Sequence, residues 1–281
     1  MSKNLEFTKM QGTGNDFIMV DARLLDMDWK SLARKACRPH FGIGADGLIL
    51  IMDSDKADLR MRIFNADGSE AQVCGNGLRC FAKYAIDRKM VTGQDISVET
   101  KAGVKLVKTT SRKGKVVRAC VNMGKPQLKA ERIPVARGTD QPVLDHKLKI
   151  GTKMLTISAV SMGNPHAVCF IGENVKDFPL SEIGPLVENH RLFPQRTNFE
   201  IVNIVGEGKL RVRVWERGVG ETLACGSGAC AVAVISRLKN ITKDEVDIIL
   251  PGGTLTVSWD GKSNIFLIGP AEEVFSGVYL L

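Results

Sequence analysis

Two short stretches decide the fold, Val73-Cys-Gly-Asn-Gly-Leu-Arg-Cys80 and Ala224-Cys-Gly-Ser-Gly-Ala-Cys230. In each, a cysteine is followed by Gly-x-Gly and then by an apolar run of helical character. The glycines let the backbone approach a ligand closely and adopt a positive φ. A cysteine at a helix start lies where unpaired N–H groups and the helix dipole favour negative charge. Each stretch therefore predicts a helix start with an activated thiol and a cradle for a carboxylate.

The two cysteines belong to an internal repeat, because Cys225 follows Cys74 by 151 positions and other residues match at the same spacing. The matched pairs are Gly12 with Gly163, Arg62 with Arg213, Phe64 with Trp215, Glu70 with Glu221, Gly75 with Gly226 and Gly77 with Gly228. One constant spacing without a net gap indicates a duplicated unit. Strand-like runs dominate both copies, and helices are expected at 29–37, 75–89, 179–189 and 226–239.

The repeat predicts an α+β fold of two pseudo-symmetric domains, each rich in strands and built around a central helix. The first domain is expected at 1–124 and the second at 125–270, with the boundary near Gly124-Lys-Pro126. The last residues, 271–281, are candidates to return to the first domain. Duplicated halves usually face each other across a cleft, and ligand sites favour such domain interfaces.

Composition narrows the class of protein. Hydrophobic residues make up 44% and charged residues 25% of the 281 residues, which is an ordinary globular balance. The apolar runs are too short to span a membrane and no targeting segment is visible, so we expect a cytoplasmic protein with no membrane partner. The seven cysteines are an odd number and are expected to be reduced thiols. We interpret five of them as buried structural residues, Cys37, Cys80, Cys120, Cys169 and Cys230.

The net charge of +8 raises the alternative of a nucleic-acid-binding module. The basic residues cluster between Lys101 and Lys129, in a segment that alternates apolar and polar residues. That pattern predicts a hairpin turning at Ser111-Arg-Lys-Gly114, with its charges on a solvated face. No aromatic RNA-binding motif accompanies the hairpin, so we expect no nucleic acid partner.

Two thiols on opposite sides of a stereocentre would suit an amino-acid epimerase. One thiolate removes the weakly acidic α-hydrogen while the opposite thiol delivers a proton to the other face. The two helix starts would stabilise the charge that develops on the carboxylate. The repeat leaves open which cysteine, Cys74 or Cys225, is the thiolate at rest.

Further motifs give the chain a resemblance to the diaminopimelate epimerase family. They are Gln11-Gly-Thr-Gly-Asn-Asp-Phe17, Gly42-Ile-Gly-Ala-Asp-Gly47, Phe64-Asn-Ala-Asp-Gly-Ser-Glu70, Met162-Gly-Asn-Pro-His166, Arg196-Thr-Asn198 and Glu216-Arg-Gly218, besides the two cysteine stretches. The resemblance implies that each domain is a strand layer wrapped round its central helix, and that the protein is often a homodimer. It implies an isomerase that interconverts LL- and meso-diaminopimelate in lysine and peptidoglycan biosynthesis, without pyridoxal phosphate, metal or another cofactor.

The resemblance also assigns roles to residues. It implies that Cys74 and Cys225 are catalytic, and that His166 and Glu216 support the thiols. The residues it implies for substrate binding are Asn15, Asn65, Gly75, Asn76, Asn164, Asn198, Glu216, Arg217, Gly226 and Ser227. Among these, the guanidinium of Arg217 suits a bidentate grip on the distal carboxylate. Many members carry glutamine where this chain has Gly47, so no side-chain role is expected there.

The same residues allow several other interpretations. A racemase for another amino acid on this scaffold is the nearest alternative, but a simple apolar substrate would not need Arg217. The segment Gly42–Gly47 spells G-x-G-x-x-G but precedes a strand-like run, so a dinucleotide site is rejected. Zinc is disfavoured because the Cys74/Cys80 and Cys225/Cys230 spacings are not those of zinc knuckles. Glu70 and Arg79 are candidates for a structural ion pair.

Overall fold

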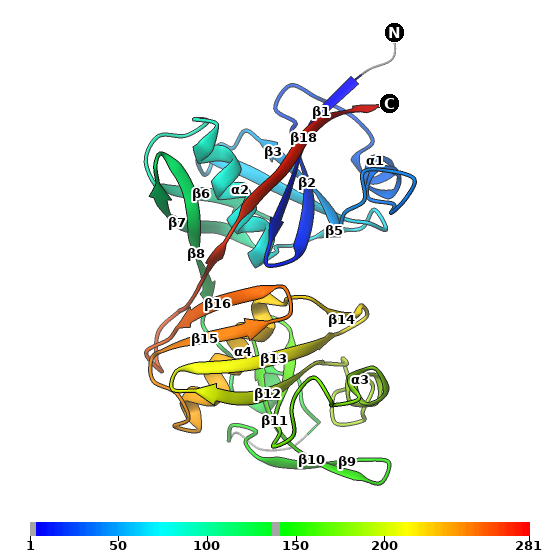
Figure 1. The fold of residues 1–281 in the computed structure, drawn as a ribbon, viewed down its shortest axis with the longest axis vertical. Coiled ribbons are helices and arrows are strands. Elements are labelled where there is room, and N and C mark those ends of the chain that lie inside the picture. Colours follow the sequence, from blue (N-terminus) through cyan, green and yellow to red (C-terminus); the bar gives the residue numbers. More distant parts are fainter. Residues whose placement is uncertain (1–3, 137–140) are drawn as a thin grey trace. The chain divides into compact units, whose positions relative to one another are not determined.

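The computed structural model describes residues 4–136 and 141–281, and the chain divides into two compact units (Figure 1). Unit 1 comprises Met1–Asn122 together with Ile268–Leu281, and unit 2 comprises Met123–Leu267. The chain leaves unit 1 within strand β8 (Lys115–Gly124) and returns to it within strand β17 (Ile265–Pro270). No helix of the described residues is long and apolar enough to cross a membrane.

Unit 1 is a curved sheet around one helix. Its further elements are β1 (Asn4–Gly12), β2 (Asn15–Asp21), α1 (Trp29–Ala36), β3 (Gly47–Met52), β4 (Leu59–Asn65), β5 (Glu70–Ala71), α2 (Gly75–Asp87), β6 (Asp95–Thr100), β7 (Gly103–Arg112) and β18 (Glu272–Leu280). The pairs β2–β3 and β4–β6 are parallel, whereas β18–β1–β2, β3–β4 and β6–β7–β8 are antiparallel. Helix α2 packs against both β1 and β7, so the strands wrap round it, while α1 packs outside against β4.

Unit 2 repeats this plan. Its elements are η1 (Ala130–Arg132), β9 (His146–Ile150), β10 (Lys153–Ser161), β11 (Pro165–Phe170), α3 (Leu180–Glu188), β12 (Asn198–Gly206), β13 (Lys209–Glu216), β14 (Gly220–Thr222), α4 (Gly226–Leu238), β15 (Glu245–Leu250) and β16 (Gly253–Ser258). The pairs β11–β12 and β13–β15 are parallel, as their counterparts in unit 1 are. Helix α4 is enclosed by β10, β11, β12, β15 and β16, and most of its residues are buried.

The structure confirms the α+β fold and its internal duplication. Helices α2 and α4 begin and end 151 residues apart, at Gly75 and Gly226 and at Asp87 and Leu238. Equivalent ion pairs brace the two copies: Arg62 Nε lies 2.8 Å from Glu70 Oε1, and Arg213 Nε lies 2.7 Å from Glu221 Oε1. The expected ion pair between Glu70 and Arg79 is wrong, because Glu70 is held by Arg62 and by Lys101 at 3.1 Å.

The expected elements agree with the structure at most of their positions. All four expected helices form, each within two residues of its expected ends. The basic hairpin also forms, with Lys113 and Gly114 at positive φ in its two-residue turn. Strands β1, β5, β9, β14 and β18 lie outside the strand-like runs of the sequence. Strand β18 matters for unit 1, since it pairs with β1 along its length and brings the end of the chain into this sheet.

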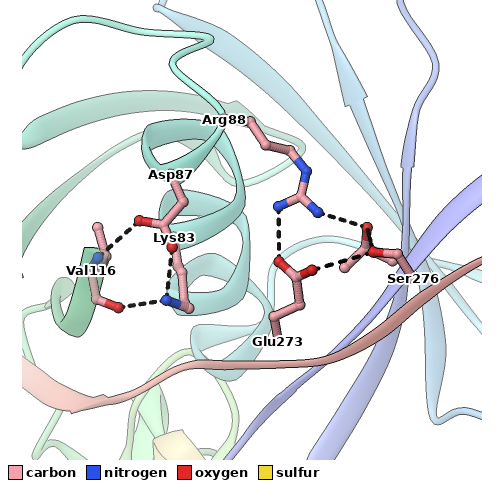
Figure 2. Close-up of polar contacts among 7 residues, drawn as sticks. Lys83, Asp87, Arg88, Val116, Glu273 and Ser276 are labelled. Atoms are coloured by element: carbon pink, nitrogen blue, oxygen red, sulfur yellow. Dashed lines mark hydrogen bonds and ion pairs between the residues drawn. The ribbon is translucent and has the colours of Figure 1, made fainter. Parts of the chain in front are cut away.

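Polar contacts fasten the second half of α2 to both ends of the unit 1 sheet (Figure 2). Arg88, which caps the helix, donates to Thr8 Oγ1 at 2.9 Å and lies 3.1 Å from Glu273 Oε2 of β18. One turn earlier, Lys83 and Asp87 form an ion pair at 2.8 Å and bond the backbone of Val116 in β8. These contacts hold α2 in its place inside the curved sheet, and with it the cysteine at its start.

Candidate active site

The two cysteines cap the two central helices. Cys74 precedes α2 with extended backbone (φ −137°, ψ 122°), and Cys225 precedes α4 in the same way (φ −119°, ψ 115°). Their sulfurs accept N–H bonds from Gly77 at 3.5 Å and from Gly228 at 3.4 Å. Each thiol therefore occupies the capping position that serine or aspartate usually fills, where the dipole favours a thiolate.

The residues that follow each cysteine begin a helix, and the backbone N–H groups of a helix start are suited to bind an anion. Gly75 and Asn76 are the first two residues of α2, and Gly226 and Ser227 are the first two of α4. N–H groups in a first turn have no acceptor within their own helix. Both helix starts can thus donate to a carboxylate beside the capping thiol.

Around Cys74, the structure gathers two of the predicted substrate ligands. Asn15, the first residue of β2, accepts from the thiol of Cys74 at 3.7 Å and from the amide of Asn76 at 3.4 Å. The Asn15 amide is itself oriented by Asp46, to which it donates at 2.6 Å. Its carboxamide is therefore fixed beside the sulfur by contacts on both sides. Unit 1 thus brings Asn15, Cys74 and Asn76 together.

Arg79 is a residue of this site that the sequence did not reveal. Its guanidinium is fully buried in α2 and donates to Asn76 Oδ1 at 2.9 Å, to Thr13 Oγ1 at 2.6 Å and to the carbonyl oxygen of Pro270 at 3.1 Å. Thr13 has a positive φ of 59° in the turn between β1 and β2. Arg79 therefore joins the start of α2 to the turn that presents Asn15.

Asn65 lies at the end of β4, opposite Gly47 in the register of β3. Its side-chain amide donates to Ser69 Oγ at 2.9 Å, and its backbone N–H donates to the carbonyl of the same serine. Asn65 is exposed and is the first residue of the turn that ends at Ser69. The described contacts within unit 1 do not join it to the Asn15–Cys74–Asn76 group.

Around Cys225 the groups are ionisable. The Cys225 sulfur lies 3.4 Å from Ser227 Oγ. The carboxylate of Glu216, at the end of β13, is near enough to act on the thiol through its charge. Burial is the main cause that raises the pKa of Glu216, while its bonds from Thr222 and Cys225 lower it. The pKa of the Cys225 thiol is raised well above its usual value, first by burial and then by the charges of Glu216 and Glu200.

His166 and Asn164, two further predicted residues, form a chain with a residue the sequence did not single out. His166 is fully buried, with Nε2 3.0 Å from Asn164 Oδ1 and Nδ1 2.7 Å from Glu200 Oε1. An ionised carboxylate only accepts hydrogen bonds, so Nδ1 would be the donor in the contact with Glu200. Glu200 lies on β12 between the apolar residues Phe199 and Ile201. At the repeat spacing of 151 residues it matches the apolar Ile49, and this mismatch is the sequence signal that marks it as unusual.

Asn198 and Arg217 are joined directly. The Asn198 oxygen accepts from the backbone N–H of Arg217 at 2.9 Å, and its amide donates to the carbonyl of Pro165 at 2.7 Å. The next N–H, that of Gly218, donates to the buried carboxylate of Glu188 at 2.9 Å. The Arg217 guanidinium bonds the carbonyl of Gln195 at 3.0 Å and is partly exposed. Asn198 therefore sets the loop from which Arg217 projects.

Four of the remaining cysteines are buried as expected, Cys37, Cys80, Cys169 and Cys230, whereas Cys120 on β8 is only half-buried. Burial raises the pKa of Cys37 and Cys80 to about 12 and that of Cys169 to about 11. Burial also raises the pKa of Cys120. Such thiols are poor nucleophiles and bases at neutral pH. Within residues 4–136 and 141–281, no group of three His, Cys, Asp or Glu side chains is placed to hold a metal ion.

The fold and these two capped thiols define a class of protein: a duplicated α+β scaffold with one cysteine at the start of each central helix. The sequence profile of the diaminopimelate epimerase family matches residues 7–129 and 158–274. The chain belongs to that family. It is 48% identical to the diaminopimelate epimerase of Methanococcus maripaludis strain C5, over 97% of this chain and 99% of that protein. It is 46% identical to that of Moorella thermoacetica, over 99% of this chain and 100% of the relative.

Solved structures of low sequence identity share the fold. A phenazine biosynthesis protein of the PhzF family from Bacillus anthracis matches with a TM-score of 0.72 and 19% identity, over 99% of this chain and 100% of that one. A probable proline racemase from Agrobacterium radiobacter matches with a TM-score of 0.73 and 14% identity, over 99% and 93% of the two chains. The scaffold is therefore common to proteins well outside the family.

Proposed function

We propose that the chain interconverts LL- and meso-diaminopimelate by a two-base inversion in which Cys74 and Cys225 act on opposite faces of the α-carbon. The observation that carries the proposal is the equivalence of the two thiols, each capping a central helix at the same place in a duplicated unit. The family membership and the near-complete matches to diaminopimelate epimerases support the substrate.

The reaction exchanges one hydrogen for another at a single carbon. One thiolate takes the α-proton, so a C–H bond breaks and an S–H bond forms. The opposite thiol then gives its proton to the other face of the carbon. The negative charge that spreads onto the α-carboxylate meets the N–H groups of Gly75, Asn76, Gly226 and Ser227. This chemistry needs no pyridoxal phosphate and no metal.

Residues outside the two cysteine turns would select the substrate. Unit 1 offers the neutral amides of Asn15 and Asn65, whereas unit 2 offers Asn164, Glu216 and Arg217. A carboxylate and a guanidinium on neighbouring positions suit an amino group and a carboxylate at the far end of diaminopimelate. Each of the two units, 1–122 with 268–281 and 123–267, would then supply one of the two bases.

Hydrogen exchange at the α-carbon tests the function. The native chain, Cys74→Ala and Cys225→Ala are incubated with LL-diaminopimelate in D2O, and both deuterium uptake and the LL-to-meso ratio are measured. We expect the native chain to exchange and invert, and each variant to lose inversion by at least about a thousandfold. Cys169→Ala is the control, since that cysteine is buried away from the helix starts. Near-native inversion by either catalytic-site variant would refute the two-base proposal.

We also propose that the protein is a cytoplasmic homodimer. Strand β18 carries three apolar side chains that are more than half exposed and stand at even spacings along it, Val274, Val278 and Leu280. Exposed apolar side chains grouped in this way often mark protein interfaces. All seven cysteines are free, which suits a reducing compartment. Sedimentation equilibrium of the native chain and of Val278→Glu tests the dimer. We expect twice the chain mass for the native protein and a single chain mass for the variant.

A further inference from the structure

Glu200 is a fully buried carboxylate in strand β12, below the first turn of α4. Its Oε1 atom lies 2.7 Å from Nδ1 of His166, which is also fully buried. Its Oε2 atom has no hydrogen-bond partner among the residues that the structure describes. A buried carboxylate with an unsatisfied oxygen is costly to the fold. Its presence between the buried apolar residues Phe199 and Ile201 therefore calls for a functional reason.

The carboxylate lies close to the thiol of Cys225, with Gly228 between them. A methyl group placed on Gly228 would lie 2.8 Å from Glu200 Oε1 and 3.4 Å from Cys225 Sγ. Because the two atoms lie 2.8 Å and 3.4 Å from that one point, at most about 6 Å separates them. A negative charge at this range, in a site with little water, opposes ionisation of a thiol.

Unit 1 has no acid at the equivalent position. The residue that matches Glu200 at the repeat spacing is Ile49, and its Cδ1 atom lies 2.9 Å from the same point built on Gly77. Two other positions differ in the same sense, because His166 matches Asn15 and Glu216 matches Asn65. At these three matched positions, the turn of Cys74 has neutral residues where the turn of Cys225 has ionisable ones.

We propose that Glu200 is the positioning residue that makes the two thiols unequal: its carboxylate fixes the ring of His166 and keeps Cys225 protonated in the resting enzyme. The inference rests on the proposed epimerase function. It makes Cys74 the resting thiolate, which takes the α-proton, and Cys225 the thiol that delivers one. The product leaves with the two thiols in exchanged protonation states, and exchange with solvent restores the resting form.

Two ionisable groups act on Cys225 from neighbouring strands, Glu200 on β12 and Glu216 at the end of β13. His166 on β11 acts on Glu216. Both acids raise the pKa of the thiol, in addition to the larger effect of its burial. Bonds from Ser227 and from the N–H of Gly228 act in the opposite direction.

The test measures the ionisation of one thiol at a time. In a Cys74→Ser background, the alkylation of Cys225 by iodoacetamide is followed across pH by mass spectrometry of its peptide. Adding Glu200→Gln, which keeps the acceptor for His166 but removes the charge, is expected to lower the pH midpoint by about one to three units. The matched control is Glu221→Gln, which removes an acid of the same unit that is paired with Arg213. We expect the control to leave the midpoint within a few tenths of a unit.

An unchanged midpoint in a folded Glu200→Gln variant would overturn the proposal. A second measurement does not depend on that variant folding. The midpoint of Cys225 in Cys74→Ser is compared with the midpoint of Cys74 in Cys225→Ser, and midpoints are used because the two sulfurs differ in exposure. We expect the higher midpoint at Cys225, and a lower one there would also contradict the proposal.

The failure of the inference is distinguishable from the failure of the function. An active diaminopimelate epimerase whose Cys225 midpoint does not respond to Glu200→Gln retains the function and loses the inference. A chain that responds as expected at Cys225 but does not exchange the α-hydrogen of diaminopimelate refutes the function, and with it the catalytic meaning of Glu200. The alkylation experiment itself needs no substrate, so the two results are independent.

Discussion

The side-chain oxygen of Asn198 accepts a hydrogen bond at 2.9 Å from the backbone N–H of Arg217. The same amide donates to the carbonyl of Pro165, so one side chain ties the start of β12 to the loop after β13 and to the start of β11. The family resemblance gives Asn198 a role in substrate binding. Its geometry supports an indirect route to that role, through the position of Arg217.

Replacing Asn198 by alanine is expected to release the Arg217 loop. The change leaves a part-buried N–H and a buried carbonyl without their partner, which costs about 1–3 kcal/mol of stability. We expect KM for diaminopimelate to rise about tenfold or more, because the guanidinium is no longer held in place. Steady-state kinetics and denaturant unfolding measure the two effects.

Asn203→Ala provides the matched control for this change. Asn203 lies on the same strand, and its amide also bridges backbone groups, those of Ile171, Glu173 and Val175. The control should cost similar stability and leave KM unchanged. If both variants raised KM equally, the effect of Asn198→Ala would reflect general loosening of β12 and not the Arg217 loop.

Replacing Arg217 by lysine keeps the charge but removes the planar fork. A lysine cannot form the two parallel bonds that a guanidinium makes with a carboxylate. We expect kcat/KM for diaminopimelate to fall about tenfold to a hundredfold, with the α-hydrogen of the bound substrate still exchanging. Arg237→Lys, in a surface ion pair with Asp244, is the control. Unchanged kcat/KM in Arg217→Lys would favour a racemase for an amino acid without a distal carboxylate.

Much of this site follows from the sequence because its signals are local. The Cys-Gly-x-Gly stretches place the starts of α2 and α4 at the residues where the structure has them. The spacing of 151 residues also carries the shared Arg–Glu ion pairs, since Arg62 and Glu70 match Arg213 and Glu221. Both the Cys-Gly-x-Gly stretches and the 151-residue repeat can be recognised in a single sequence, because each consists of given residue types at a fixed spacing.

Other parts depend on contacts between distant segments and left no local signal. Strand β18 has no fixed relation to β1 in the sequence, and only the fold shows the register that pairs Asn4 with Leu280. Arg79 looks like an ordinary helical arginine until the fold buries it against Thr13 and Pro270. In the sequence, Glu200 between the apolar residues Phe199 and Ile201 suggests a side chain that points to solvent, whereas the fold buries it. Only the comparison with Ile49 in the other copy marks it as unusual.

Burial of Glu216 predicts a specific dependence of stability on pH. Its pKa is raised in the folded state, chiefly by burial, so the folded chain holds that proton more tightly than the unfolded chain does. The resulting stabilisation is complete below the ordinary pKa of 4.5 and is lost as the pH rises through the folded value. Ionised Glu216 therefore makes the native protein less stable at neutral pH than it would be with a neutral group.

Glu216→Gln mimics the protonated acid and still accepts the bond from Thr222. We expect the variant to be more stable than the native chain by about 1 kcal/mol at pH 8, with the difference shrinking toward zero at pH 4. Urea unfolding at several pH values measures it. Glu221→Gln, which loses an ion pair with Arg213, should not gain stability. A gain for Glu216→Gln that stayed constant from pH 4 to pH 8 would show that ionisation is not its cause.

Mild oxidation is expected to link the two catalytic sulfurs, because a two-base mechanism requires both sulfurs to reach one carbon atom. Two thiols that converge on one atom can approach within disulfide distance. We expect a mild oxidant to inactivate the enzyme by linking Cys74 to Cys225, with the loss of two hydrogen atoms from the chain mass, and dithiothreitol to restore activity. Peptide mapping identifies the link. Buried thiols such as Cys37 and Cys80, whose pKa burial raises to about 12, should react far more slowly. Cys74→Ser should form no such link, and full activity after both sulfurs are oxidised would contradict a shared substrate carbon.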